Sequence, residues 1–534
     1  MMMIPQQLSF STAVPAIVGI YIFRWILISI LHTQRAQRMG CKPAFVRPSK
    51  LPFGIDILKR YIDTTRQQIL QNDEVVVYEE LGQRPTWNQN ILGNWHHVTM
   101  DPKNVQAMLA TQFKDFELGP LRRNLFGPVI GKGIFTSDGK EWQHSRALLR
   151  PQFARGQIAN LELEERHVQH LLDRLPVQHD SWTDVVDLAP LFFNLTLDSA
   201  TEFLFGQSAN SQVGSLKANQ SQEPGAAVPA GLPDGLSFGK AFDRANTVVV
   251  LRSWLTDLYF LYSPAQFHKD CAEIHEFARY YVNLVLAEEL QSRDNKGSSG
   301  NPTDSGYVFL RELVKETKDP EELRTQLLNI LLAGRDTTAG LLGWTFYLLS
   351  RHVDVYEKLH AVVLETFGEF SSNTSITFES LKSCSYLQHV LSEVLRLHPP
   401  VPENSRRAVR NTTLPRGGGA DGSSPIYIRA GEEVTYNVHI MQRRKDIWGD
   451  DAEEFRPERW TGHKPGWEFL PFNGGPRICL GQQFALTEAA YVIVRMLQRF
   501  DKVENMDKST VVKHKYTTTT APVQVLVRLH STSH

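Results

Sequence analysis

Cysteine is scarce in this chain of 534 residues, and the few cysteines present are far apart. There are four, with no C-x-x-C pair among them: Cys41, Cys271, Cys384 and Cys479. This spacing excludes a zinc ribbon and a disulfide-rich secreted domain, and it fits a reducing compartment. An excess of charge of one sign is also missing. The formal net charge is −1 at pH 7, so composition gives no reason to expect nucleic-acid binding.

The sequence also lacks a long polar linker, so we expect one large catalytic domain over residues 55–534. Its hydrophobic fraction of 42% is enough for a sizeable core. From about residue 138 to residue 500 the apolar residues recur mostly at helical spacing. We predict strands at three places: Glu74–Tyr78, Trp95–Met100 and Val523–Leu529. The predicted fold class is therefore mainly α with small β-sheets.

Signals for individual helices are clearest at three places. Asp101 and Asp319 are each followed by Pro, which is the pattern of an N-cap and a first helical residue. The apolar segment 238–290 is interpreted as a pair of helices. Polar stretches at residues 209–234 and 292–305 flank it and are interpreted as loops.

The N-terminal segment is mostly apolar from Phe10 to Leu31. That run is long enough to cross a bilayer as a helix, which takes roughly 20 residues. Arg24 lies inside the run, where a charge is costly. We predict a single-pass membrane anchor in residues 1–34. An interfacial or core helix and a cleaved signal peptide are alternatives.

The orientation of this anchor follows from its flanking charges. No Lys or Arg precedes Arg24, whereas three basic residues follow the run: Arg35, Arg38 and Lys42. The positive-inside rule then places the N-terminus outside the cytosol and the rest of the chain inside it. Residues 35–54 are predicted to be a basic, Pro-containing hinge, because proline stops a helix and stiffens the chain.

Cys479 belongs to the run F-N-G-G-P-R-I-C-L-G, residues 472–481, which precedes an amphipathic helix. The positive end of that helix favours a thiolate, and the glycines permit close approach of a ligand. A lone cysteine is more often a small buried hydrophobe. The F-x-x-G-x-R-x-C-x-G spacing instead suits a metal-bound thiolate, with haem as the best-fitting cofactor. The run resembles the haem-thiolate loop of the cytochrome P-450 superfamily.

A second motif, A-G-R-D-T-T-A, occupies residues 333–339 within a long apolar helix. Gly334 costs that helix about 1 kcal/mol relative to Ala, which close approach of a flat ligand could offset. The Thr337 hydroxyl can reach back to the Ala333 carbonyl, and Asp336 can relay protons from solvent. A kinked structural helix is the alternative. The motif resembles the oxygen-activating helix of the same superfamily, which implies catalytic roles for Asp336 and Thr337.

Glu393 and Arg396 lie three residues apart on one strongly apolar helix. A buried ion pair needs a further partner for its remaining hydrogen bonds, and Arg459 can supply one. These residues resemble the E-x-x-R and P-E-R-W elements of the superfamily. The resemblance implies a structural role for Glu393, Arg396 and Arg459.

The resemblance implies haem b as cofactor, with an axial thiolate from Cys479. The two haem propionates need cations, and Arg477, close to the thiolate, is the first candidate. Trp142 and Arg146, one helical turn apart, and Arg406 are implied as further propionate-binding residues. Phe472 is expected to pack against the sulfur side of the haem.

Five segments are similar to the fungal and yeast group that hydroxylates n-alkanes and fatty acids: residues 131–135, 150–153, 413–419, 448–457 and 473–488. This similarity implies an NADPH- and O₂-dependent monooxygenase acting on a lipophilic substrate. The implied partners are NADPH–cytochrome P-450 reductase, with cytochrome b5 as a further candidate, and the endoplasmic reticulum membrane, with the catalytic domain in the cytosol. His352-Val353-Asp354 departs from the family pattern because it lacks the usual proline.

Three other functions remain open from the sequence. One is a monooxygenase of a fungal secondary metabolite, and another is a haem-thiolate isomerase or dehydratase that needs no reductase. The third is a membrane-anchored haem sensor or carrier. The intact motif at residues 333–339 favours the monooxygenase.

Overall fold

The computed structural model describes residues 10–154, 156, 161–213, 234–294, 308–372 and 374–531, and the side chains of all of these except residues 10–17 and 291–294. The polar stretches at residues 209–234 and 292–305 lie mostly outside the described residues.

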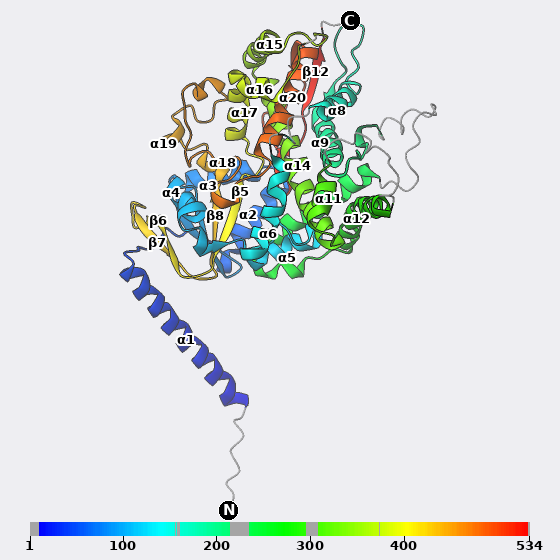
Figure 1. The fold of residues 1–534 in the computed structure, drawn as a ribbon. Helices are drawn as coiled ribbons and strands as arrows, with labels where there is room; N and C mark the ends of the chain where they lie inside the picture. The colour runs from blue at the N-terminus through cyan, green and yellow to red at the C-terminus, as the bar shows by residue number, and fades with distance from the viewer. Residues whose placement is uncertain are drawn as a thin grey trace, which may run out of the picture.

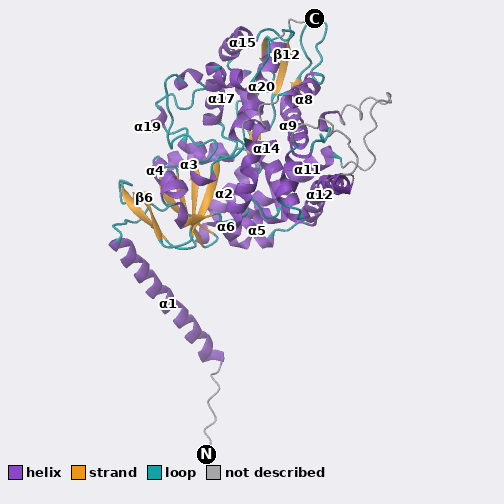
Figure 2. Cartoon of the chain, in the orientation of Figure 1, coloured by secondary structure: helices purple, strands orange, loops and turns teal. Residues whose placement is uncertain are grey.

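Helices dominate the described chain (Figures 1 and 2). Those of the body are α5 (Gly119–Ile130), α6 (Gly139–Leu149), α8 (Glu162–Leu172), α9 (Leu188–Phe205), α11 (Gly235–Trp254), α12 (Ala265–Asp294), α13 (Phe309–Glu316), α14 (Pro320–Leu349), α15 (Val353–Phe367), α16 (Phe378–Ser383), α17 (Ser385–Leu397) and α20 (Gln482–Arg499). Shorter helices accompany the largest sheet: α2 (Ile55–Arg66), α3 (Leu70–Glu80), α4 (Pro102–Gln106), α18 (Val438–Met441) and α19 (Lys445–Trp448).

The strands form small sheets beside this helical body. A five-stranded sheet has the order β1 (Thr86–Ile91), β2 (Asn94–Thr99), β8 (Glu433–Asn437), β5 (Glu403–Ala408) and β3 (Phe116–Glu117). Its β2–β8 pair is parallel, and the other neighbours are antiparallel. The smaller sheets are β4 (Val186–Asp187) with β12 (Leu526–His530) and β9 (Lys502–Asn505), β6 (Thr412–Gly418) with β7 (Ser424–Ile428), and β10 (His514–Tyr516) with β11 (Thr520–Pro522). The predicted fold class is confirmed.

Helix α14 runs through the centre of the body and packs against α9, α12, α17 and α20. Nearly all of its residues are buried. Each fully buried Leu contributes about 1.5–3 kcal/mol relative to an exposed one, so this helix anchors the core. It begins as predicted: the Asp319 side chain accepts a hydrogen bond from the Glu321 backbone N–H at 2.9 Å, and Pro320 is the first residue.

The other predicted helix signals are also confirmed. Asp101 caps α4 by accepting from the backbone N–H of Lys103 at 2.8 Å. The apolar segment 238–290 forms α11 and α12. Of the predicted strands, Trp95–Met100 matches β2, and Val523–Leu529 overlaps β12 with a shift of a few residues.

The predicted strand at Glu74–Tyr78 is wrong, because these residues lie in helix α3. The three consecutive valines, Val75–Val77, favour a strand by propensity. Burial follows a helical stripe instead, with Leu70, Glu74 and Val77 facing the protein. Tertiary packing therefore overrides the local preference.

Two histidines, His398 and His514, contact the indole of Trp344, which is fully buried in α14, and a third, His439, lies beside His514. The ring of His398 stacks on Trp344 with centroids 3.9 Å apart, and His514 lies 5.8 Å from His398 and 6.1 Å from His439. Burial lowers the pKa of all three histidines, to about 3 for His514. The cluster is therefore uncharged at neutral pH.

Helix α1 (Phe10–Arg38) projects away from the body (Figure 1). Large apolar side chains on it are exposed, among them Ile20, Phe23 and Trp25. It contacts the body where the His32 ring nitrogen lies 3.0 Å from the Tyr427 hydroxyl in β7. Within the described part of the chain, no helix combines the length and the apolar character needed to cross a membrane.

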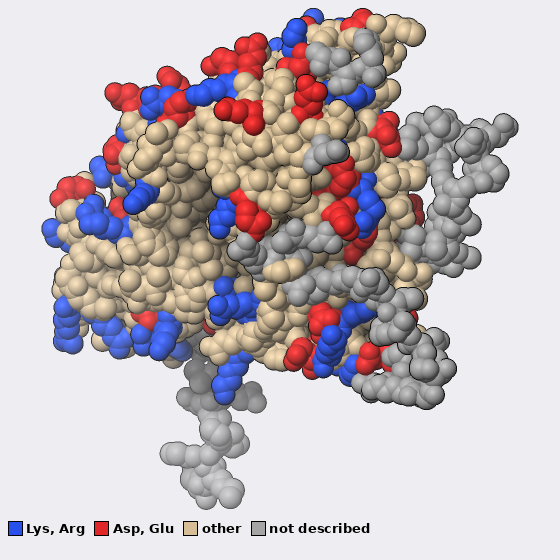
Figure 3. Space-filling model, turned by 45° about the horizontal axis from the view of Figure 1, so that its top comes forward, with Lys and Arg blue, Asp and Glu red and all other residues tan. Residues whose placement is uncertain are grey.

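The surface carries both signs of charge on the face shown in Figure 3, with broad areas of other residues between them. This distribution agrees with the net charge of −1.

Candidate active site

The loop that carries Cys479 is fixed by a backbone hydrogen bond at Phe472, by the start of α20 and by close packing against Leu109. The Cys479 backbone N–H donates to the Phe472 carbonyl at 3.0 Å, and α20 begins three residues later, at Gln482. At Gly475 the backbone φ is +67°, and a Cβ there would come within 1.9 Å of the Leu109 carbonyl oxygen. Only glycine fits this position, so the loop is pressed closely against the chain at Leu109.

Cys479 is the one exposed cysteine of the four, all of which the structure describes. Cys479 lines a cavity of the protein. Burial raises the pKa of this thiol, while the Gly481 backbone N–H and the charge of Arg146 lower it by smaller amounts. A coordinating metal ion is the kind of partner that deprotonates such a thiol outright.

The cavity lies between this loop and α14. Its wall includes most of the residues predicted for the site: Cys479, Arg477, Phe472, Trp142, Arg146, Arg406 and Thr337. The sequence-predicted residues thus come from four separate places along the chain, and the fold brings them to one chamber.

Four arginines line the cavity: Arg122, Arg146, Arg406 and Arg477. Among the described ion pairs, only one involves any of them, between Arg477 and Asp138 at 2.6 Å. Burial, followed by the charges of the other three arginines, lowers the pKa of Arg477 to about 10 in spite of Asp138. The cavity wall therefore carries more positive charge than Asp138 neutralises.

On the opposite wall, the Thr337 hydroxyl donates to the Ala333 carbonyl at 2.6 Å, as the sequence predicted. Gly334 also faces the cavity, and a Cβ there would meet only Ala200, at 3.9 Å. The helix surface beside Thr337 is therefore open to a ligand.

Asp336 does not line the cavity, although it is adjacent to Thr337 in sequence. Its carboxylate accepts from Arg335 at 2.9 Å, and Arg335 also donates to Asp243 at 2.7 Å. Lys515 pairs with the other oxygen of Asp243 at 2.7 Å. Burial raises the pKa of Asp336. The chain of polar groups leads from Asp336 to the partly exposed Asp243, away from the cavity.

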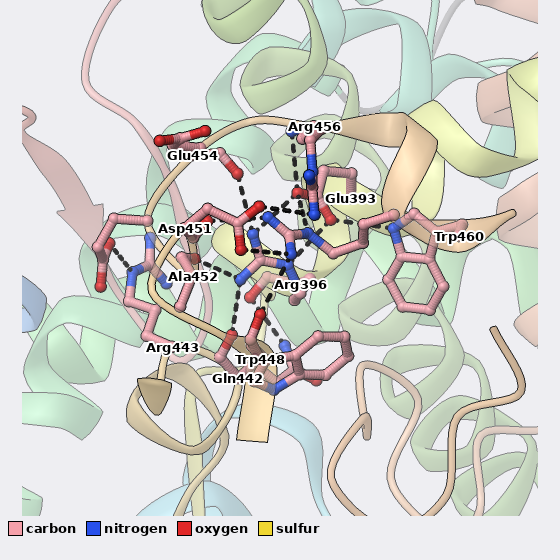
Figure 4. A network of polar contacts seen from close by, with 12 residues as sticks. Glu393, Arg396, Gln442, Arg443, Trp448, Asp451, Ala452, Glu454, Arg456 and Trp460 are labelled. Carbon is pink, nitrogen blue, oxygen red and sulfur yellow. Dashed lines mark hydrogen bonds and ion pairs between the residues drawn. The ribbon is translucent and has the colours of Figure 1, made fainter. Parts of the chain in front are cut away.

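The structure brings Glu393, Arg396 and Arg459 together in a buried network. Figure 4 shows Glu393 and Arg396 at its centre, with Trp460 beside them. Arg396 donates to both Glu393 oxygens, at 2.8 and 2.9 Å, and Arg459 Nε donates to Glu393 at 3.0 Å. The Trp460 indole N–H donates to the same carboxylate at 2.9 Å. Arg396 also donates to the carbonyls of Gln442, Ala452 and Glu454. The pair is thus fully satisfied, which a buried pair requires.

A family model described as cytochrome P450 matches residues 61–527 of this chain. The chain belongs to the cytochrome P450 family. The curated relatives of this P450 include the cytochrome P450 monooxygenase g430 of Fusarium sp, 46% identical over 493 residues, which cover 92% of this chain and 85% of the relative. Cytochrome P450 52A13 of Debaryomyces hansenii is 46% identical, covering 90% of this chain and 89% of the relative.

A solved structure supports the fold independently. The crystal structure of the cytochrome P450DA heme domain aligns with a TM-score of 0.71 at 20% identity, covering 92% of this chain and 98% of that chain. Together with the fungal and yeast relatives, it confirms the resemblance inferred from the Cys479 loop.

The cofactor of this P450 is haem b, with an axial thiolate from Cys479. The cavity fits it, because the excess positive charge of the arginine cluster suits two propionates. In addition, the buried indole N–H of Trp142 has no hydrogen-bond partner among the described residues.

Two residues of this site were missed by the sequence reasoning. Arg122 lies in the cavity wall on α5, and Asp138 holds Arg477. Neither belongs to a spaced motif. The adjacent arginines at 122 and 123 were the only signal, and such a pair is ordinarily a surface feature.

Proposed function

We propose that this P450 hydroxylates a long-chain lipophilic substrate, an n-alkane or a fatty acid, with electrons from NADPH delivered by NADPH–cytochrome P450 reductase. One oxygen atom of O₂ enters a C–H bond of the substrate, and the other leaves as water with two electrons and two protons. The observation that carries the proposal is the joint exposure of Cys479 and Thr337 to one largely apolar cavity.

Haem, when bound, supplies O₂ binding and activation, and its thiolate ligand donates electron density. We assign propionate binding to Arg477, Arg146, Arg406 and Trp142, since all four lie in the cavity wall. Phe472 packs on the sulfur side. The Glu393, Arg396 and Arg459 network keeps the segment before the Cys479 loop in place.

Protons reach the site along α14 in this proposal. Thr337 presents its hydroxyl to the cavity and holds a proton at Oγ1. Asp336 is the adjacent relay, and its carboxylate is held by Arg335, which also pairs with the partly exposed Asp243. Since the Asp336 carboxylate is bonded to Arg335, delivery requires this side chain to turn from Arg335 toward Thr337.

We also propose attachment to the endoplasmic reticulum membrane through α1, with the catalytic domain in the cytosol. Its exposed apolar side chains support a lipid environment, and the basic residues Arg35 and Arg38 follow them. Deleting residues 1–38 should release the protein from vesicles in a flotation assay. Retention of the truncated protein on vesicles would contradict this assignment.

Cys479→Ser tests the central assignment. We expect it to abolish the red-shifted absorption band of the reduced carbon-monoxide complex, which reports a thiolate ligand, together with NADPH-dependent hydroxylation. Cys384→Ser is the matched control, because Cys384 is buried in the core outside the cavity. A band that survives in Cys479→Ser would overturn the ligand assignment. Product formation from a fatty hydroperoxide without reductase would instead favour an isomerase.

A further inference from the structure

Asp138 occupies the N-cap position of α6, yet its side chain makes no capping hydrogen bond to that helix. Its carboxylate accepts from two other segments instead. One oxygen accepts from the Leu118 backbone N–H at 2.9 Å and from Arg477 at 2.6 Å, and the other accepts from the Gly119 N–H at 3.0 Å. An N-cap aspartate ordinarily stabilises its own helix by about 1 kcal/mol, so these outside contacts point to another role.

The two backbone N–H groups hold the Asp138 carboxylate in one place. They come from the start of α5, where Gly119 has a φ of +82°, a conformation that glycine adopts without strain. This turn directs two successive N–H groups at the same carboxylate. Since the Asp138 side chain is only 11% exposed, its charge is fixed in position and poorly screened by solvent.

Arg477 lies between this carboxylate and the indole of Trp142. The guanidinium carbon is 4.4 Å from the centroid of the indole, and Nη2 also donates to the Ser137 carbonyl at 3.1 Å. Asp138 is the one ion-pair partner of Arg477 among the described residues. Asp138 therefore orients the guanidinium and offsets its charge.

Asp138 acts on the cavity that contains Cys479 only at second hand, because Arg477 lines this cavity and Asp138 does not. The other three arginines of the wall are Arg122, Arg146 and Arg406, and no described ion pair includes them. Arg477 is thus the cavity arginine whose charge the described part of the protein itself offsets.

We propose that Asp138 is a positioning residue for the haem and acts on it through Arg477. The carboxylate fixes Nη2, which leaves the remaining guanidinium donors for a propionate. This proposal rests on the assignment of Arg477 to a propionate in the proposed function. Reduction adds one negative charge to the haem, so an arginine without its counter-charge would favour reduction. Asp138 accordingly keeps the reduction potential lower than the four arginines alone would set it.

The test is a redox titration of the haem in the full-length holoenzyme. Asp138→Asn removes the charge but keeps an oxygen that can accept from the Leu118 N–H. We expect the ratio of ferrous to ferric enzyme at a fixed potential to rise about three- to tenfold, a positive shift of about 28–59 mV for a one-electron couple. Asp138→Ser, a second variant without the charge, should give the same shift, whereas Asp138→Glu should restore the parent potential.

A double variant tests whether the effect passes through Arg477. Arg477→Gln alone should lower the potential, because it removes a cation from the surroundings of the haem. In that background, Asp138→Asn should shift the potential by less than half as much as in the parent, since the carboxylate then acts only from a distance. Equal shifts in the two backgrounds would overturn the proposal.

Glu141→Gln is the matched control, because Glu141 lies on the same helix, 3.7 Å from Lys132, with its side chain 55% exposed. It should leave the potential unchanged, and a shift as large as that of Asp138→Asn would count against the proposal. The proposal is also overturned if Asp138→Asn and Asp138→Ser leave the potential unchanged or lower it while Arg477→Gln lowers it. An unchanged potential in Arg477→Gln would instead refute the propionate assignment. An enzyme without the thiolate-dependent carbon-monoxide band would refute the proposed function itself.

Discussion

Glu393 and Glu403 are both buried carboxyl groups, yet their surroundings differ completely. Glu393 accepts hydrogen bonds from two arginines, an indole N–H and a backbone N–H. Glu403 receives one hydrogen bond, from the Tyr516 hydroxyl, and faces a cavity. The Glu393 carboxylate has a structural role, because its hydrogen bonds within the protein leave no lone pair for a ligand. A carboxyl with one partner can accept further hydrogen bonds, and burial raises the pKa of Glu403.

The largest expected effect is on the Glu393 network. Glu393→Gln should lower the free energy of unfolding by about 3–5 kcal/mol, because it leaves the buried guanidinium of Arg396 without its counter-charge, whereas Arg459 keeps Asp451 at 3.1 Å. Denaturant unfolding of the purified protein measures this loss. The control is Lys358→Met, which breaks the exposed ion pair with Glu458 and should cost less than about 1 kcal/mol. Similar losses for the two variants would refute the contrast between buried and exposed pairs.

A carboxyl between these extremes is Glu488 in α20, which accepts a hydrogen bond from the Ser199 hydroxyl. Burial raises its pKa to about 7. In the unfolded chain this carboxyl ionises near its ordinary pKa of 4.5, so the unfolded chain loses its proton first. The contribution of Glu488 to stability therefore falls as pH rises from about 4.5 to 7. Glu488→Gln should remove this fall, of up to about 3 kcal/mol. The difference in the free energy of unfolding between the variant and the parent, measured in steps across that range, should therefore change in favour of the variant as pH rises.

The same pH dependence in Glu488→Gln and in the parent over this interval would show that Glu488 ionises normally. Glu321→Gln, at the exposed start of α14, is the control and should leave the profile unchanged.

The next effect concerns function rather than folding. Thr337→Ala should divert electrons from product to peroxide, because it removes the hydroxyl that we assign to the proton path. We expect a several-fold fall in product per NADPH, equivalent to about 1 kcal/mol. Thr345→Ala is matched to it: Thr345 lies in the same helix and donates to the Leu341 carbonyl at 2.8 Å, but it does not face the cavity. Equal coupling in the two variants would remove Thr337 from the proton path.

The smallest effect is expected at Glu403. Glu403→Gln keeps an uncharged group of the same shape, and its amide oxygen can still accept from Tyr516. The free energy of unfolding at neutral pH should stay the same or rise by about 1 kcal/mol, because a buried acid with a raised pKa no longer has to be held protonated. A clear loss in denaturant unfolding would mean that Glu403 is ionised and paired after all.

The comparison also explains what could be predicted from the sequence. The Glu393 network and the Cys479 loop could be predicted from the sequence because their residues recur at fixed spacings. Glu393 and Arg396 are three residues apart, and Arg477 and Cys479 are two residues apart. Arg47, Glu74 and Glu403, which line a second cavity, have no such spacing. They meet through a parallel pairing of β2 with β8 and through α3, whose valines resemble a strand. Their meeting depends on long-range topology, which local patterns do not encode.

The histidine cluster around Trp344 has a consequence for acid tolerance. His398, His439 and His514 take up protons only after the core opens, because their folded pKa values lie below the ordinary 6.5. Acidification from about pH 6.5 toward 3 therefore drives proton uptake by the unfolded chain and weakens the native state. The ring contacts that join α14, the end of α17 and β10 at neutral pH thus set a lower limit to the pH at which α14 keeps its place.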